Sequence, residues 1–300
     1  MRVSHASIPC ALPLLVLAQH FAPHESIEFE LSPLPKAYEL DPFYAKHVDV
    51  RGFPVLSSTR VPDQALFEAA YLVDRMLVRD DVREALIERK VRFAVMAHDE
   101  LTTAIPEHSD LEPARYWDRR ARGLGATPWR PAVSCGAENL LGYSGDPYAA
   151  ENILIHEFAH AIHGMGMKHI DRTFQPRLEK AYAAAMEAGL YAGKYAATNV
   201  NEYWAEGVQS FFDTNRENDA DHNHVDTREE LEEYDRALFA LVAEVFPGAD
   251  WRYVKPADRA EPGHLAGWDA TSAPRFEWPA DLEAWYREYE AKQREGEGGR

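Results

Sequence analysis

The chain is poor in cysteine, in basic residues and in long apolar runs. Its 300 residues include only two cysteines, Cys10 and Cys135. Two thiols provide neither a disulfide framework nor a cysteine-rich zinc knuckle, so any bound metal must be held by histidine and carboxylate side chains. Lysine and arginine number 32 against 50 acidic residues, which gives a formal net charge of −18. This balance argues against a nucleic-acid partner, because a phosphate backbone requires a basic footprint.

The N-terminal segment contains the apolar stretch ALPLLVLA, whose small final residues are typical of a signal-peptidase site. This pattern predicts a signal peptide over residues 1–18 and a secreted or extracytoplasmic protein. Cleavage after Ala18 would remove Cys10 and leave Cys135 without an intramolecular partner. An ordinary N-terminal core segment is the alternative, since prolines interrupt the run. No other apolar run is long enough to span a bilayer, so we expect no stable membrane insertion.

Apolar periodicity predicts both strands and helices. The short β-compatible runs HVDV and PVLSS lie within residues 28–60, and VRFAVMA (Val91–Ala97) is rich in strand formers. AVSCGAENLLGY (Ala132–Tyr143) is expected to form another strand and a turn. Helices are expected after Pro62, at Asp81–Arg89, and then at Ala149–Gly164, Pro176–Gly189, Asn199–Thr214 and Thr227–Phe246.

The segment ILIHEFAHAIHG carries His156, Glu157 and His160 in an HExxH pattern. In a helix, a spacing of four places both imidazoles on one face, where they can reach the same ion. Glu157 then faces the metal-bound water and can take its proton as the water attacks a carbonyl. The flanking residues are apolar, as expected for a buried helix around a metal site. The alternative is a set of satisfied core polar groups or a solvated stripe, but burying them without a metal or partners would cost several kcal/mol.

A catalytic zinc site needs a third protein ligand. The metzincin continuation HExxHxxGxxH is absent, because His163 stands where glycine is required and Gly166 where the third histidine would be. The remaining candidates are Glu202 and Glu206, four residues apart on one face of a predicted helix. One would bind the metal while the other hydrogen-bonds an imidazole. An exposed acidic stripe is the alternative, which the flanking apolar residues disfavour. His163 and His169 fit no ligand pattern and are expected at a helix end or at the surface.

The segment YAATNVNEYWAE, which follows HEFAH, resembles the catalytic domain of anthrax lethal factor and its relatives, including the Pro-Pro endopeptidases. The resemblance covers about residues 153–212. It implies that His156, His160 and Glu202 bind one Zn²⁺ per chain. It also implies that Glu157 is the general base, that Tyr195 donates a hydrogen bond to the oxyanion, and that Glu206 lies just outside the ligand shell.

Together these features predict an α+β, zincin-like fold, in which a small sheet packs on the HExxH helix and a mainly helical C-terminal half supplies Glu202. A single metallopeptidase domain is expected over residues 19–291, followed by a flexible tail at 292–300. The predicted function is zinc-dependent hydrolysis of a peptide or protein substrate, by an endopeptidase rather than an exopeptidase. An edge strand near Ala132–Leu141 is expected to hold the substrate backbone by β-addition.

Two other functions remain open at this point. A His/His/Glu triad also suits non-haem iron, so the protein could be an iron-dependent oxygenase. A non-catalytic binding domain with a structural zinc is the third hypothesis. Closed structural sites fill all four positions with protein ligands, however, and no fourth ligand stands out in the sequence.

Overall fold

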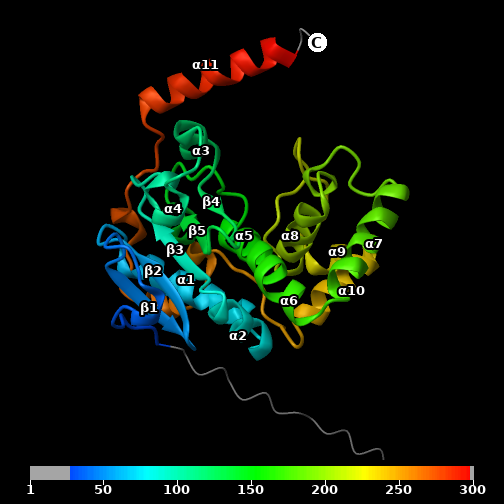
Figure 1. Ribbon diagram of the computed structural model, residues 1–300, viewed down its shortest axis with the longest axis horizontal. Coiled ribbons are helices and arrows are strands. Elements are labelled where there is room, and N and C mark those ends of the chain that lie inside the picture. Colours follow the sequence, from blue (N-terminus) through cyan, green and yellow to red (C-terminus); the bar gives the residue numbers. More distant parts are fainter. Residues whose placement is uncertain (1–27, 298–300) are drawn as a thin grey trace, which may run out of the picture.

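The computed structural model describes residues 28–297. The expected signal peptide at 1–18, together with Cys10, lies outside the described residues, as do the last three residues of the expected tail. The described part is an α+β fold, as predicted, and its small sheet is mixed and has five strands. Figure 1 shows the sheet and the helices within residues 174–245 on opposite sides of the central helix α5 (Ile153–Ala161). No helix among the described residues is long and apolar enough to cross a membrane.

The sheet has the strand order β1-β2-β3-β5-β4. The two runs expected to form strands near the N-terminus pair as the antiparallel hairpin of β1 and β2, while β2, β3 and β5 are parallel. The short β4 pairs antiparallel with β5 and forms the edge. The strands are β1 (Lys46–Val50), β2 (Phe53–Ser57), β3 (Arg92–Met96), β4 (Gly123–Leu124) and β5 (Ala132–Gly136).

The prediction that the strand near Ala132–Leu141 lies at the edge of the sheet is wrong. Both sides of β5 are paired, to β3 and to β4, and the residues after it form helix α4 (Ala137–Leu141). The error has a physical cause: β4 is only two residues long, so its pairing leaves no alternation in the sequence. The strand at the edge beside α5 is therefore β4.

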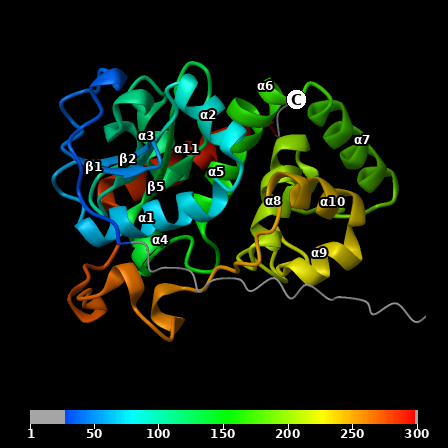
Figure 2. The ribbon, with the colours of Figure 1, turned by 90° about the horizontal axis from the view of Figure 1, so that it is seen from below.

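Helices α1 and α5 pack on the sheet, α1 against β1 and β2 and α5 against β5. The apolar residues that predicted α1, among them Leu66, Ala70 and Val73, are fully buried. Figure 2 shows α1 running along the strands while α5 lies between the sheet and the helices within residues 174–245. The helices of this half are α1 (Asp63–Met76), α2 (Asp80–Glu88) and α3 (Ala114–Arg120).

The C-terminal half is mainly helical, as expected. The predicted helix at Thr227–Phe246 is split at Asp235, whose carboxylate accepts hydrogen bonds from the Leu238 amide (3.0 Å) and the Tyr203 hydroxyl (2.5 Å). Two helices form because this buried carboxylate caps the second one. The helices are α6 (Lys168–Ile170), α7 (Phe174–Glu187), α8 (Val200–Phe211), α9 (Arg228–Tyr234), α10 (Arg236–Val245) and α11 (Ala280–Glu297).

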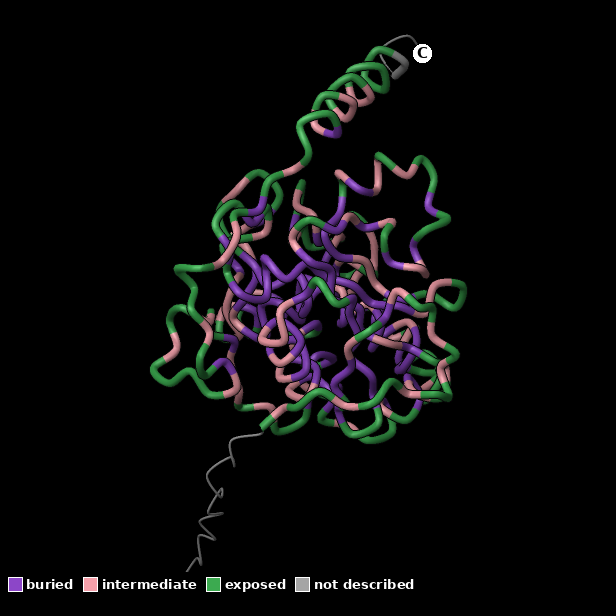
Figure 3. The backbone as a smooth tube through the Cα atoms, turned by 90° about the vertical axis from the view of Figure 1, so that its left-hand side faces the viewer, coloured by how far each residue is buried: buried purple, intermediate pink, exposed green. Residues whose placement is uncertain are grey.

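Helix α11 continues past the expected domain boundary at residue 291. It packs on α3 and projects from the body, where Figure 3 shows it largely exposed. In the rest of the described chain, the larger of two clusters of buried apolar side chains reaches from the strands to helices α8 and α10, and a smaller cluster includes Tyr44, Leu56 and Met96. This shared core holds α5 and α8 in fixed relative positions, because close-packed interiors resist displacement.

His108 is buried on the face of the sheet opposite to α1 and α5, with 1% of its surface exposed. Its Nε2 lies 3.1 Å from the Ser134 hydroxyl of β5. Burial lowers the pKa of His108 from 6.5 to about 4. Between these values the unfolded chain binds a proton that the folded chain does not, so stability falls as the pH falls from 6.5 to 4. The full loss is about 3 kcal/mol.

We expect His108→Gln to reduce the pH dependence of the free energy of unfolding within this window. The glutamine keeps a polar partner for Ser134 but does not titrate. Urea titrations of both proteins at pH 7, 6, 5 and 4.5 would measure the difference. If the free energy of unfolding depends on pH in the same way in both proteins, the lowered pKa of His108 is contradicted.

Candidate metal centre

Helix α5 is held at its start by two buried asparagines. The Asn152 side chain accepts from the Ile155 amide at 3.1 Å, and the Asn139 side chain accepts from the Ile153 amide at 2.9 Å. The helix therefore begins at Ile153 rather than at the expected Ala149, because these caps satisfy its first free amides. One face of α5 packs through Phe158 on the aromatic residues of the sheet. The HExxH side chains consequently lie on the face turned to α8.

Helix α8 is positioned by contacts at its start and along its middle. The Asn199 side chain accepts from the amides of Asn201 (2.8 Å) and Glu202 (3.1 Å) and caps the first turn. The Trp204 indole donates to the Ala159 carbonyl of α5 at 2.9 Å. Further along, a Cβ added at Gly207 would lie 2.5 Å from a Leu238 methyl, so glycine allows α10 to approach closely. These contacts bring Glu202 to the HExxH face.

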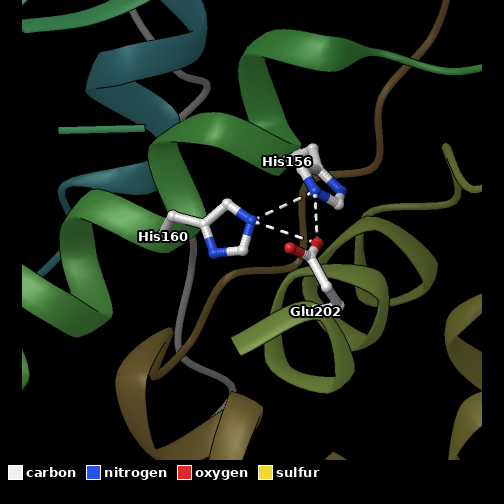
Figure 4. A group of neighbouring side chains, drawn as sticks. All are labelled: His156, His160 and Glu202. Atoms are coloured by element: carbon white, nitrogen blue, oxygen red, sulfur yellow. Dashed lines mark hydrogen bonds and ion pairs between the residues drawn. The ribbon is translucent and has the colours of Figure 1, made fainter. Parts of the chain in front are cut away.

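Three side chains from these two helices meet at one point (Figure 4). The Nε2 atoms of His156 and His160 are 3.1 Å apart, and the Glu202 carboxylate lies 3.2 Å from the first and 3.3 Å from the second. A tetrahedral zinc ion with bonds of about 2.1 Å separates its ligand atoms by roughly 3.4 Å. The triangle therefore fits a metal ion bound by three protein ligands. Among residues 28–297 it is the one such group of histidine, cysteine and carboxylate side chains.

Gln209 fixes the protonation of His156, a role that sequence reasoning missed. The Gln209 amide nitrogen donates to Glu151 at 2.9 Å, so its oxygen faces the His156 Nδ1 at 2.7 Å and accepts from it. With the proton of the neutral imidazole on Nδ1, the Nε2 lone pair points into the triangle, as a metal ligand requires. The spacing of three residues from Glu206 to Gln209 on α8 was the signal available in the sequence.

The charges around the triangle favour a cation. Burial opposes ionisation of Glu202, yet its hydrogen bonds with His156 and His160 hold its pKa well below the usual range. Burial also opposes a charge on His156, but Glu202, Glu157 and Glu206 raise its pKa to about 10. The same carboxylates that attract a proton to this point would attract a metal ion.

Glu206 lies behind His156 rather than within the triangle. One carboxylate oxygen is 3.6 Å from the His156 Nδ1. The other accepts from the Asn215 side chain at 3.1 Å and lies 3.3 Å from the His222 Nε2. The structure thus places Glu206 just outside the three ligand atoms, with Gln209 making the shorter contact to His156.

Glu157 lies between α5 and the edge strand. A Cβ added at Gly123 would lie 3.0 Å from the Glu157 side chain, and one added at Gly125 would lie 2.9 Å from the His160 side chain. Glycines at these positions therefore allow β4 to lie directly over the HExxH face. Burial raises the pKa of Glu157, while the two nearby imidazoles lower it. A carboxylate with a raised pKa is a stronger base, which suits a proton acceptor.

Tyr195 stands at the other side of the triangle, at the start of a short turn (Tyr195–Ala197). Its amide donates to the Asp221 carbonyl at 2.7 Å, and its ring centroid lies 6.3 Å from that of His156. Burial raises the pKa of Tyr195, so the phenol stays protonated at neutral pH and can donate a hydrogen bond.

The three side chains of the triangle line one cleft of about 930 Å³ together with Glu157, Tyr195 and Glu206. Its walls come from α3, from β4 and the loop after it, from the HExxH face of α5, from α8, and from residues 216–222. A cleft of this volume is large enough for several residues of an extended peptide.

His163 differs from its expected place. It lies in a π-helical turn (Ile162–Met167) that follows α5, has 1% of its surface exposed, and hydrogen-bonds Gln175 at 2.6 Å. The prediction of a surface position is wrong because the π-helical turn and the packing of α7 enclose this side chain. His169 is exposed, as expected.

We expect Gln209→Leu to lower zinc affinity by about 10–100-fold, since the partner that orients a liganding imidazole is lost. Gln175→Leu is the matched control, because it removes the glutamine partner of His163, which is outside the triangle. Competition with a chromophoric chelator would measure both dissociation constants. Equal affinities for the two variants would show that Gln209 does not orient His156.

Comparisons of the chain with protein-family models, with curated proteins and with solved structures returned no match. The resemblance to the lethal factor catalytic domain therefore stays a prediction that rests on the motifs within residues 153–212. Any function must be argued from the side chains and distances described above.

Proposed function

We propose that the protein is a zinc-dependent peptidase with a zincin-like arrangement of sheet and active-site helix. The observation that carries the proposal is the triangle of His156, His160 and Glu202 ligand atoms, 3.1–3.3 Å apart, in a cleft that also contains Glu157 and Tyr195. Three protein ligands leave a fourth position for water, which is the pattern of catalytic zinc. The motif resemblance supports the same assignment.

Bound zinc would supply a Lewis acid that acidifies water and polarises the scissile carbonyl. Glu157 takes a proton from the attacking water as the new carbon–oxygen bond forms. The Tyr195 hydroxyl donates to the carbonyl oxygen while that oxygen gains negative charge. Protonated Glu157 then passes its proton to the amide nitrogen, and the carbon–nitrogen bond breaks. The new carboxylic acid gives its remaining proton to the departing amine, so the products are a carboxylate and a protonated amine, and Glu157 is again a carboxylate.

We propose that β4, in place of the strand first predicted, holds the substrate backbone. Gly123 and Leu124 pair with β5 on one side and line the cleft. An extended peptide can add to such an edge through main-chain hydrogen bonds. Its scissile bond would then lie over the HExxH face, because Gly123 of β4 and Gly125, which follows the strand, lie close to this face.

The test combines metal analysis with peptide cleavage. Protein purified anaerobically is expected to contain one zinc per chain and no iron. It should cleave members of a peptide library at internal bonds, as mass spectrometry of the products would show. A chelator should abolish the cleavage, and added zinc should restore it.

Each alternative has its own outcome in this test. Stoichiometric iron without cleavage would favour the oxygenase, for which Glu157 has no evident role. Zinc without cleavage of any peptide would favour a binding domain. Release of single terminal residues would keep the peptidase but make it an exopeptidase.

A further inference from the structure

The cleft contains three basic side chains that differ in their partners. Arg216 is neutralised by Asp219 at 2.7 Å and Glu151 at 3.8 Å. Arg120 and Lys168 also line the cleft, and no carboxylate of the described residues lies within 4.0 Å of either. Arg120 is therefore an arginine of the cleft whose charge is not neutralised by a carboxylate of the described residues.

Helix α3 shows the contrast most clearly, because it carries three arginines. Arg115 pairs with Asp281 at 2.8 Å and Arg119 pairs with Glu283 at 2.5 Å, both on α11. Arg120, the last residue of α3, is exposed and lines the cleft instead. Two arginines of α3 are therefore paired with carboxylates of α11, whereas the third, Arg120, lines the cleft and can contact a ligand there.

Arg120 lies next to the reacting groups. Its guanidinium interacts electrostatically with the Tyr195 phenol, and both residues line the cleft. Its backbone carbonyl accepts from the Tyr148 hydroxyl at 3.4 Å, which anchors the end of α3 to the wall of the cleft. A group bound by Arg120 would thus lie beside the proposed oxyanion donor, within a residue or two of the scissile bond.

We infer that Arg120 binds a carboxylate of the substrate, so that the enzyme prefers peptides with a carboxylate next to the scissile bond. This inference rests on the proposed peptidase function. A guanidinium presents paired N–H donors that match the two oxygens of a carboxylate. The overall charge of −18 repels acidic peptides at long range, but salt screens that repulsion over about 8 Å, whereas a contact pair inside the cleft is screened much less.

The carboxylate could come from two sources. One is the side chain of an aspartate or glutamate in the middle of a longer peptide. The other is the free C-terminus of a peptide that ends one or two residues beyond the scissile bond. Matched peptides with Glu or Gln at each position, each made as the C-terminal acid and as the amide, distinguish the two sources.

Binding is measured by calorimetry with the zinc-loaded Glu157→Gln protein, so the readout does not require turnover. We expect Arg120→Gln, made in the same background, to weaken binding of the carboxylate peptide by about 10–100-fold. Binding of the neutral counterpart should change less than about twofold. Arg115→Gln is the matched control on the same helix, since it removes a surface ion pair of little energetic value, and it should leave both affinities unchanged.

Two results would overturn the inference. One is equal affinity of the Arg120-containing protein for carboxylate and neutral peptides. The other is an equal loss for both peptides in Arg120→Gln, which would mean that Arg120 only positions Tyr195. Both differ from failure of the proposed function, which would appear as absence of zinc or absence of cleavage by the wild-type protein. If the wild-type enzyme cleaves peptides but either of these two results is found, the inference is wrong and the proposed peptidase function still stands.

Discussion

Glu157→Gln is expected to lower kcat for peptide hydrolysis by about 10²–10⁴-fold. Glutamine has nearly the same shape as glutamate, but its amide cannot accept the proton of the attacking water. Burial raises the pKa of Glu157, which makes its carboxylate a stronger base, and the substitution removes this base. Initial rates on a peptide identified from the library, measured with zinc-loaded protein, provide the test.

The zinc content of this variant should equal that of the wild type, because Glu157 contributes no atom to the triangle of ligands. Glu187→Gln is a suitable control, since this exposed carboxylate ends α7 and does not line the cleft. Its rate should be unchanged. Turnover of Glu157→Gln within a few fold of the wild type would rule out Glu157 as the base.

Glu202→Ala is expected to weaken zinc binding by more than about 100-fold, beyond the usual effect of a residue outside the ligand shell. Glu202 supplies the carboxylate oxygen that lies 3.2 Å and 3.3 Å from the two imidazole nitrogens. Its lowered pKa keeps it ionised at neutral pH, so it offers a full negative charge to the ion. Without it, two imidazoles are left to hold the metal.

Glu206→Ala is the comparison variant, because Glu206 is the other candidate for the third ligand. Glu206 is four residues further along α8 and lies 3.6 Å from the far nitrogen of His156, so its loss should cost no more than about 10–100-fold. Chelator competition gives both affinities, and far-UV circular dichroism checks that the variants are folded. A larger loss in Glu206→Ala than in Glu202→Ala would exchange the two assignments.

The elements that could be predicted are those with a strong local pattern. The buried face of α1 was visible as apolar residues three and four apart, and the helix with HExxH was visible for the same reason. The split between α9 and α10 could not be predicted from the sequence, because it depends on a hydrogen bond that the buried Asp235 accepts from the Tyr203 hydroxyl on α8. The position of the sheet edge was missed because β4 is too short to show alternation.

The metal-ligand candidates His156 and His160 followed from the sequence alone, since a spacing of four on a helix leaves two side chains on one face whatever the surrounding fold. The sequence also narrowed the third ligand to two glutamates. Only the packing of α8 on α5 brings Glu202 to the imidazole nitrogens and Gln209 behind His156. Likewise, only the ends of α3 and β4 place Arg120 and the glycines over the cleft. The reason is that helical spacing is set by the backbone within one turn, whereas contacts between distant segments depend on how the whole core packs.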